Sequence, residues 1–179
     1  MSVERKVVMK NILLTGRPGS GKSSLIKKLA EGRRVGGITT PEIRKRGLRW
    51  GFEIVDLRSG KRGVLASVEE KEGPQVSKYR ANLENLNEIG VSAIENAIDD
   101  PYVELIVIDE IGKMEFFSEE FRKVVKGALN SDKPVLAAIS LYDFDPFIKE
   151  IKARSDAKLF VLERGNFDKV LSEIQALLK

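Results

Sequence analysis

The stretch that decides the fold runs from residue 16 to residue 23 and reads Gly16-Arg17-Pro18-Gly19-Ser20-Gly21-Lys22-Ser23. It fits G-x-x-x-x-G-K-[ST], the Walker A pattern, in which backbone N–H groups surround the phosphates of a nucleoside triphosphate. Residues Lys10–Thr15 before it read as a strand, and residues Lys22–Ala30 after it read as an amphipathic helix. Because the dipole and free N–H groups of a helix start favour an anion, this context predicts a triphosphate site.

The composition limits the chemistry that this chain can perform. Its 179 residues suit one domain, here expected over residues 1–179, and 42% hydrophobic with 32% charged residues indicates a globular protein. It contains no Cys and no His, which excludes a thiol nucleophile, a disulfide, a His base and a His/Cys zinc site. A metal must therefore be a hard ion on oxygen ligands, which suits Mg²⁺, and a general base must be Asp, Glu, Lys or Tyr.

No apolar stretch is long enough to span a bilayer, and residues 1–10 lack the apolar region of a signal peptide. We therefore expect a cytoplasmic protein without a membrane partner. The net charge of +4 is compatible with binding nucleic acid or a triphosphate, but it first indicates a solvated surface of mixed charge. Heavy use of Lys, Arg and Glu without Cys resembles the composition of thermophilic proteins.

Strand-like and helix-like segments alternate along the chain, which predicts an α/β domain with a mostly parallel sheet flanked by helices. An antiparallel β-hairpin is expected between about residues 46 and 67, and residues 69–79 read as a loop. Asn82 and Ser118 are expected to cap helices. The other expected strands are 34–40, 104–108, 134–140 and 158–162, and the other helices are 82–98, a segment after Ser118, 145–154 and a segment from Phe167.

A second motif follows the apolar strand Leu105–Ile108, where the chain continues with Asp109-Glu110. In P-loop proteins an acid at such a Walker B strand end holds Mg²⁺ together with the hydroxyl of the loop, here Ser23. Lys22 is expected to contact the β- and γ-phosphates. Glu110 is the best-placed base to deprotonate an attacking water, which favours hydrolysis over transfer to another substrate. Lys22 and Glu110 are thus the candidate catalytic residues, and Ser23 and Asp109 the candidate metal ligands.

Phosphoryl transfer commonly needs an arginine that stabilises charge in the transition state. The sequence does not choose among its candidates, which are Arg17, Arg44, Arg154 and Arg164.

The chain resembles the small archaeal and bacterial nucleoside-triphosphatases of the thermophilic type, whose relatives include the human cancer-related nucleoside-triphosphatase. Residues 12–29, 36–57 and 105–118 carry the resemblance, and Gly112-Lys113-Met114-Glu115 is the most specific part because the general Walker B pattern does not extend through it. The resemblance implies a RecA-like P-loop core. It also implies Mg²⁺-dependent, slow hydrolysis of ATP, GTP and other nucleoside triphosphates to diphosphate and phosphate, with broad base tolerance.

By the same resemblance, nucleotide-binding segments are expected at Gly16–Ser24 and at Leu105–Gly112, the latter with Asp109, Glu110, Ile111 and Gly112. Contacts near the γ-phosphate or the transition state are expected from the following residues: Thr39, Thr40, Glu42, Arg44 and Arg154. Family members often carry Asn-Arg-Asp before the last helix, whereas this chain has Asn166-Phe167-Asp168. Phe167 could stack on a base, but the favoured interpretation is that Asn166 caps the helix and Phe167 begins its apolar stripe.

Two other functions remain open from the sequence. A nucleotide, nucleoside or polynucleotide kinase would use the same loop, with the basic segment Lys149–Arg154 as a lid; Glu110 argues against it. A nucleotide-dependent nucleic-acid-binding protein would use a basic cluster with Trp50 and Phe52. This cluster comprises Arg33, Arg34, Arg44, Lys45, Arg46 and Arg49. We favour instead that Trp50 and Phe52 form the buried face of the hairpin. The oligomeric state cannot be read from the sequence.

Overall fold

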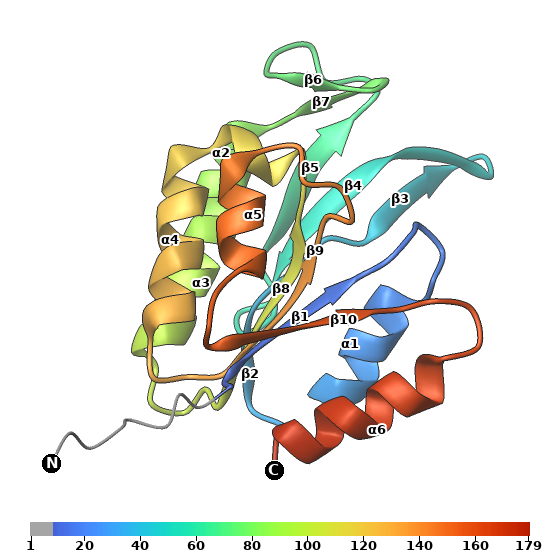
Figure 1. Cartoon of the computed structure of the whole chain (residues 1–179). Coiled ribbons are helices and arrows are strands. Elements are labelled where there is room, and N and C mark those ends of the chain that lie inside the picture. The colour runs from blue at the N-terminus through green and yellow to red at the C-terminus, as the bar shows by residue number, and fades with distance from the viewer. Residues whose placement is uncertain (1–8) are drawn as a thin grey trace, which may run out of the picture.

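The structure is a computed structural model, and residues 9–179 are described; the expectations for residues 1–8 lie outside them. Within this range ten strands form one sheet in the order β10-β1-β9-β8-β2-β4-β5-β7-β6, and β3 pairs with β4. Figure 1 shows this sheet as the central layer of the molecule, with helices on both faces.

The parallel half of the sheet carries the P-loop. Its strands β10, β1, β9, β8 and β2 pair in parallel with their neighbours in that order. Because helices cover both faces, the central strands are buried on both sides and read as continuous apolar runs. The bounds of these strands are β1 Asn11–Thr15, β2 Val35–Thr39, β8 Leu105–Ile111, β9 Val135–Ile139 and β10 Ala157–Val161. This half confirms the predicted α/β sheet.

The antiparallel half is larger than the predicted hairpin. Its strands are β3 Glu42–Lys45, β4 Leu48–Asp56, β5 Arg62–Ser67, β6 Gln75–Val76 and β7 Tyr79–Ala81. The expectation of a loop over residues 69–79 was wrong for its last residues, which form β6 and the start of β7. These two strands are too short to leave a periodic pattern in the sequence. The sequence also missed β3, which joins β4 through a turn with positive φ at Arg46 and Gly47 (52° and 76°), as in the tight turns of β-hairpins.

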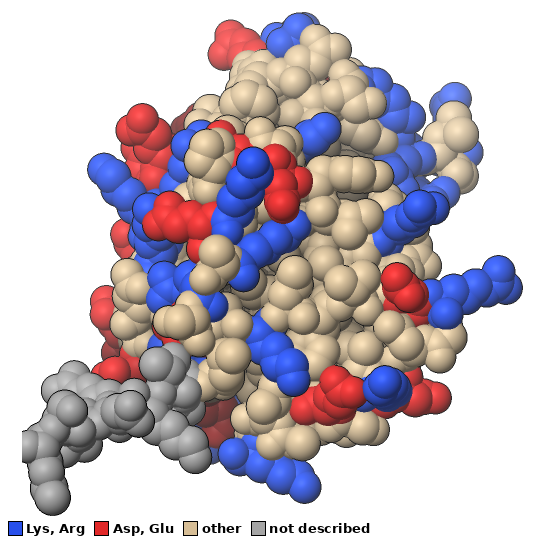
Figure 2. Space-filling view, viewed as in Figure 1, with Lys and Arg blue, Asp and Glu red and all other residues tan. Residues whose placement is uncertain are grey.

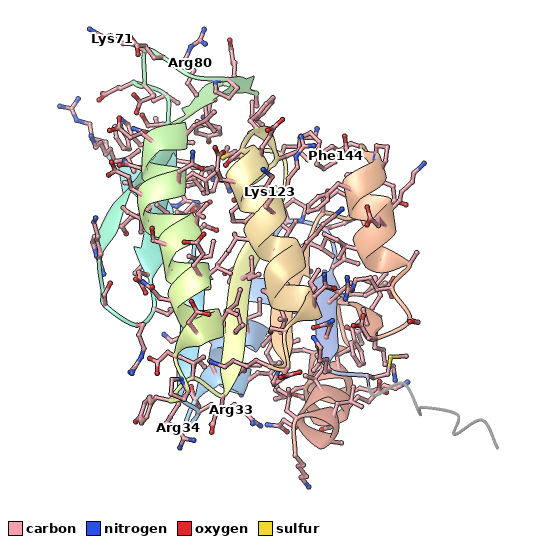
Figure 3. The ribbon with its side chains drawn as sticks, turned by 90° about the vertical axis from the view of Figure 1, so that its left-hand side faces the viewer. Arg33, Arg34, Lys71, Arg80, Lys123 and Phe144 are labelled. Atoms are coloured by element: carbon pink, nitrogen blue, oxygen red, sulfur yellow. The ribbon has the colours of Figure 1, made fainter. Side chains whose placement is uncertain are left out.

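The helices cover the two faces of the sheet, and each face has its own apolar core. Helices α1 Lys22–Ala30 and α6 Phe167–Leu177 cover one face, whereas α3 Ser92–Asp99, α4 Glu119–Asn130 and α5 Pro146–Lys152 cover the other (Figures 1 and 3). The predicted helix 82–98 consists of α2 Leu83–Asn85, the π-helical turn Leu86–Val91 and α3. None of the helices within residues 9–179 has both the length and the apolar character needed to cross a membrane.

The predicted caps are present where the sequence placed them. Asn82 Oδ1 accepts a hydrogen bond from the N–H of Asn85 (2.9 Å), and Ser118 Oγ accepts one from the N–H of Phe121 (3.1 Å). These side chains satisfy N–H groups that have no partner inside the helix, so they fix where α2 and α4 begin.

Candidate functional site

The P-loop joins the carboxyl end of β1 to the amino end of α1. Thr15 Oγ1 donates to the carbonyl of Ile139 (2.8 Å), which ties the end of β1 to β9. Gly16 has φ 154°, and a Cβ there would lie 2.5 Å from the carbonyl oxygen of Leu162. Gly21 is the N-cap of α1 with φ 99°. Only glycine meets both demands, so the loop can turn tightly and leave its N–H groups toward a ligand.

Two polar side chains of the loop point back into it. Lys22 Nζ donates to the carbonyls of Gly16 (2.8 Å) and Arg17 (3.1 Å), which holds the ammonium group over the loop. Ser20 Oγ is buried and finds no hydrogen-bond partner among residues 9–179. A buried hydroxyl without a partner is costly, and an oxygen-rich ligand in the loop would satisfy it. The loop therefore presents both a positive charge and an unsatisfied donor to an anion.

The end of β8 meets the start of α1. Ser23 Oγ lies 3.3 Å from Asp109 Oδ2, and Thr40 Oγ1 donates to the carbonyl of Asp109 (2.6 Å). Ser23 and Asp109, 86 positions apart in the chain, thus meet at one sheet edge, as expected for the carboxyl ends of parallel strands. Burial raises the pKa of Asp109, while the Ser23 hydrogen bond and the charge of Lys22 oppose that rise. Burial also raises the pKa of Glu110, against the charge of Lys22.

Glu115 is a third acid at this site, and sequence reasoning did not assign it a role. It lies in the short helix η2 Glu115–Phe117, is only 5% exposed, and its Oε2 accepts a hydrogen bond from the N–H of Gly112 (3.1 Å). Burial, and next the charge of Glu110, raise its pKa to about 8. The signal was present in the Gly112–Glu115 stretch, but proximity to Glu110 arises only from the fold.

The three acids line one cavity of about 540 Å³. Its polar lining includes Asp109 and Glu110 together with Ser23 and Thr40. Its other walls come mainly from the antiparallel half of the sheet and the segment after β8. These wall residues are Pro41, Glu42, Phe52, Leu65, Val76, Gly112, Lys113, Met114 and Glu115. This volume falls in the range of small-molecule sites, which is roughly 300–1,000 Å³.

A second cavity of about 450 Å³ lies along the glycine-rich part of the P-loop. It is lined by residues 16–20 together with Leu141, Val161, Leu162, Glu163 and Arg164. The two cavities have no lining residue in common. The P-loop borders both of them: Ser23 lines the 540 Å³ cavity, and residues 16–20 line the 450 Å³ cavity. The loop can therefore be approached from two regions of the surface.

The donor set at the junction of α1 and β8 fits a hard cation. Ser23 Oγ and Asp109 Oδ2 are both oxygen ligands, and they are close enough to share one ion. Within residues 9–179 no group of three or more acidic side chains is arranged to hold a metal. Two protein ligands suit Mg²⁺, which usually keeps several waters and takes its remaining ligands from substrate phosphates.

The residues expected near the γ-phosphate divide into two groups. Thr40 and Glu42 line the 540 Å³ cavity with Ser23 and Asp109, and Thr39 borders a neighbouring pocket with the same two residues. Arg44 is exposed on the β3–β4 hairpin, where its Nε lies 3.0 Å from Glu42 Oε2. Arg49 pairs with the same carboxylate. Thr39, Thr40 and Glu42 thus lie beside the site, whereas Arg44 is held by a neighbouring acid.

The expectation for Arg154 was wrong. Its guanidinium donates to Asp156 Oδ1 (2.9 Å), to the Leu129 carbonyl (3.1 Å) and to Asn130 Oδ1 (2.8 Å). Asp156 in turn precedes β10 and accepts from the N–H of Asn11, at the amino end of β1. Because the P-loop follows the carboxyl end of β1, Arg154 lies at the opposite end of the sheet.

The segment expected to form a kinase lid, Lys149–Arg154, is packed against the sheet. Most of it belongs to α5, whose Ile148 and Ile151 are buried in the core. Lys152 Nζ forms an ion pair with Asp143 (2.7 Å). A helix held by core side chains and by Arg154 is part of the scaffold.

The basic cluster expected from the sequence is split in the structure. Arg33 and Arg34 lie at the amino end of β2, at the lower end of Figure 3, and Arg34 pairs with Glu104. The remaining members lie on the projecting β3–β4 hairpin (Figure 1), and Lys and Arg gather along that edge in Figure 2. Phe52 packs on the core, as favoured. Trp50 is only half-buried, and Lys45 Nζ lies 3.6 Å from its ring centroid, so the expectation of a buried Trp50 is met only in part.

Phe167 packs beneath the P-loop, where its ring would lie 3.5 Å from a Cβ at Gly21. It joins the core between the sheet, α1 and α6, so the favoured apolar role holds. Asn166 precedes α6 as expected, but its side chain does not cap it. Instead Asn166 Oδ1 accepts from the N–H of Glu163 (2.8 Å), and its Nδ2 donates to the Val161 carbonyl (2.9 Å). These bonds shape the turn that borders the second cavity.

Comparison with known proteins agrees with this geometry. A family model described as NTPase matches residues 11–175. Nucleoside-triphosphatase THEP1 of Methanothermobacter thermautotrophicus is 45% identical over 172 residues, covering 93% of this chain and 95% of the relative. Nucleoside-triphosphatase THEP1 of Thermotoga maritima is 44% identical over 169 residues, covering 94% and 95% of the two chains.

Two solved structures share the fold. The crystal structure of THEP1 from the hyperthermophile Aquifex aeolicus has a TM-score of 0.83 at 35% identity and covers 94% of this chain and 99% of that one. The solution structure of a human cancer-related nucleoside triphosphatase has a TM-score of 0.79 at 34% identity and covers 95% and 97%. With the P-loop, the strand-end acids and these relatives together, the chain belongs to the nucleoside-triphosphatase (NTPase) family.

Proposed function

We propose that this protein hydrolyses nucleoside triphosphates to diphosphate and phosphate with the help of Mg²⁺. The observation that carries the proposal is the meeting of Ser23, Asp109 and Glu110 at one cavity beside the P-loop. The printed names of the relatives, nucleoside-triphosphatase, support the same reaction. The reacting phosphate would lie between the loop, which carries Lys22, and the carboxylates at the end of β8.

The P-loop residues would bind and orient the triphosphate. Lys22 would leave the carbonyls of Gly16 and Arg17 and bind the β- and γ-phosphates, where its charge counters the charge that develops on the transferred group. Ser20 Oγ would donate the hydrogen bond that it lacks. The main rearrangement when the ligand binds would be the move of the Lys22 ammonium group from these carbonyls to the phosphates.

Glu110 would accept the proton of the attacking water. Burial raises its pKa, which makes it a better base than an exposed carboxylate, and the charge of Lys22 favours its ionised form. Glu115 stands beside it with a higher pKa, about 8, and is therefore mostly protonated at neutral pH. A protonated neighbour adds no negative charge, so Glu115 would let Glu110 remain ionised near Asp109.

Ser23 and Asp109 would hold Mg²⁺ together with the phosphate oxygens. The ion would neutralise negative charge on the phosphates, which the single positive charge of Lys22 cannot balance. Asp109 is suited to this role because its backbone is fixed by Thr40 and its carboxylate already faces Ser23.

Broad base tolerance and slow turnover are parts of the same proposal. The cavity along the P-loop offers Leu141, Val161 and Leu162, whose apolar contacts would suit any base. The lining of the cavity beside Glu110 includes no arginine among residues 9–179, and Arg17 and Arg164 are exposed beside the other cavity. Without an arginine on the transferred phosphate, hydrolysis is expected to be slow. We also propose that the chain acts as one domain in the cytoplasm.

The test is the substitution Glu110→Gln, which keeps the size of the side chain and removes the base. We expect phosphate release from Mg·ATP to fall by about 10²-fold or more, within the range given for general-base catalysis. Binding of a non-hydrolysable ATP analogue should change little. Glu173→Gln, at an exposed position of α6 that lines neither cavity, is the matched control. Wild-type phosphate release by the Glu110→Gln protein would remove Glu110 from the mechanism.

A further inference from the structure

The cavity beside Glu110 extends well beyond the space that a γ-phosphate needs. Its volume is about 540 Å³, and its apolar lining includes Phe52 of β4, Leu65 of β5 and Val76 of β6. These three strands belong to the part of the sheet inserted between β2 and β8. Water attack on a phosphate needs no apolar wall, so hydrolysis alone leaves this part of the cavity unexplained.

A bound triphosphate would leave this space free. The loop borders the second cavity through residues 16–20, and that cavity has room for the base and the ribose. The β- and γ-phosphates would then point toward Lys22 and Ser23, at the edge of the first cavity. The γ-phosphate would consequently stand at a cavity that Glu110 shares with these apolar side chains.

The walls of this cavity suit an uncharged ligand with a planar ring. Phe52 stands edge-on to Tyr79 with ring centroids 5.4 Å apart, which fixes its ring in place. The lining includes four acids and a single cation, Lys113. Lys113 Nζ lies 5.9 Å from the ring centroid of Phe144 (labelled in Figure 3). Phe144 itself does not line the cavity. Two of the four acids contribute little negative charge, because Glu42 pairs with Arg44 and Arg49 and Glu115 is mostly protonated at neutral pH. Asp109 and Glu110 would still repel an acceptor with its own phosphate, whereas a hydroxyl could donate to Glu110.

We infer that this cavity is a phosphoryl-acceptor site for an uncharged nucleoside, which would stack its base on Phe52 and turn a sugar hydroxyl toward Glu110. The inference rests on the proposed function, because it uses the same loop and the same base. Glu110 favoured hydrolysis in the sequence, but a carboxylate can accept a proton from a sugar hydroxyl as well as from water. The hydroxyl oxygen forms a bond to the γ-phosphorus, and the bond from that phosphorus to the bridging oxygen of the diphosphate breaks. The hydroxyl proton passes to Glu110. The products are a nucleoside diphosphate and a nucleoside monophosphate, and water reacts when no nucleoside is bound.

The experiment follows the label from Mg·[γ-³²P]ATP in the presence of adenosine, guanosine, cytidine or uridine, with chromatography of the products. We expect labelled nucleoside monophosphate from at least one of the four. Val76→Arg would fill part of the cavity from β6, so we expect it to lose this product at least tenfold while phosphate release without nucleoside stays within about twofold. Val68→Arg, at an exposed valine outside the cavity lining, should behave like the wild type. Phe52→Ala, a second variant, should raise the KM for the nucleoside.

The outcomes separate this inference from hydrolysis. If phosphate is released from ATP alone but none of the nucleosides becomes labelled, the acceptor site is refuted and the hydrolase stands. Labelled monophosphate without phosphate release in the absence of nucleoside would support the acceptor site and refute hydrolysis as the main reaction. Labelled diphosphates from added nucleoside monophosphates, with no product from nucleosides, would overturn the charge argument and with it the inference.

Discussion

Single residues set the electrostatics of the site. Burial raises the pKa values of Asp109 and Glu110, and the positive charge of Lys22 lowers both. Within residues 9–179, no other cation contributes to these two shifts. The Lys22 ammonium group now bonds two carbonyls of its own loop, so it is held in place before any ligand arrives. The nearby Ser20 hydroxyl is buried and makes no hydrogen bond within residues 9–179. The site therefore depends strongly on this one charge.

We expect Lys22→Ala to abolish tight binding of nucleoside triphosphates or their turnover. The variant removes the phosphate contact and the positive charge near the two carboxylates, which would then repel the ligand more strongly. Isothermal titration with Mg²⁺ and a non-hydrolysable ATP analogue measures the first effect, and phosphate release measures the second. Lys27→Ala, on an exposed position of the same helix, is the control and should leave both unchanged. Full activity of the Lys22→Ala protein would rule out this role.

Glu115 predicts a pH dependence of stability. Its pKa rises from 4.5 to about 8 on folding, so the native state binds more protons than the unfolded state between these pH values. The free energy of unfolding should therefore be highest below about pH 4.5 for this group and fall as the pH rises through about 8. The loss is of the order of a few kcal/mol, since one pKa unit corresponds to about 1.4 kcal/mol.

Glu115→Gln should remove most of this dependence, because an amide of the same shape cannot ionise. Urea unfolding in EDTA-containing buffer at pH 5, 6, 7 and 8 would compare the two proteins. Some slope should remain, since Asp109 and Glu110 also have raised pKa values and contribute with the same sign. Identical slopes in both proteins would contradict a buried, protonated Glu115.

At the scale of secondary-structure elements, the fold separates chemistry from scaffold. The carboxyl ends of β1 and β8 bring the P-loop and the acids together. At the other end of the sheet, Arg154 joins the end of α4 to the segment before β10. A charged side chain thus belongs to the site or to the scaffold according to the end of the sheet at which it lies.

We expect Arg154→Ala to lower the free energy of unfolding by about 1–3 kcal/mol, because it removes charge-assisted hydrogen bonds to the Leu129 carbonyl and to Asp156. Phosphate release per folded molecule should stay at the wild-type rate. Arg34→Ala is the control, since its pair with Glu104 is exposed and should contribute less, about 0–1 kcal/mol. A large fall in turnover for Arg154→Ala, with unchanged stability, would restore its expected place near the phosphate.

For the molecule as a whole, a bound nucleotide and metal should stabilise the fold. The candidate nucleotide site joins the P-loop after β1 to the acids at the end of β8, which are distant in the chain. A ligand that contacts both segments binds only the folded chain and therefore stabilises it. Nucleic-acid binding stays a prediction, carried now only by the basic side chains of the β3–β4 hairpin.

Removal of Mg²⁺ with excess EDTA should abolish phosphate release and reverse most of the thermal stabilisation by a non-hydrolysable ATP analogue. The physical reason is that Asp109 and the triphosphate are both negative and need a cation between them. The melting temperature with and without analogue, measured in EDTA and after Mg²⁺ is restored, checks this outcome. Asp109→Asn should weaken the dependence on Mg²⁺. Equal stabilisation in EDTA and in Mg²⁺ would argue against a metal at Ser23 and Asp109.

The sequence by itself determined the P-loop, the apolar strand that ends in Asp109 and Glu110, and the parallel core. These features are local: glycine spacing, apolar runs and capping residues act within a few positions of the chain. It also placed the helix starts at Asn82 and Ser118, for the same reason. The Gly112–Glu115 stretch was visible as a pattern, but not as an acid beside Glu110.

Only the tertiary structure decided the surroundings of the loop. β3, β6 and β7 are short, and their pairing depends on neighbours distant in the chain, so periodicity could not reveal them. The burial of Glu115, the apolar residues that share a cavity with Glu110 and the place of Arg154 likewise follow from contacts across the sheet. Local pattern fixed the phosphate-binding loop of residues 16–23, whereas long-range packing decided what stands around it.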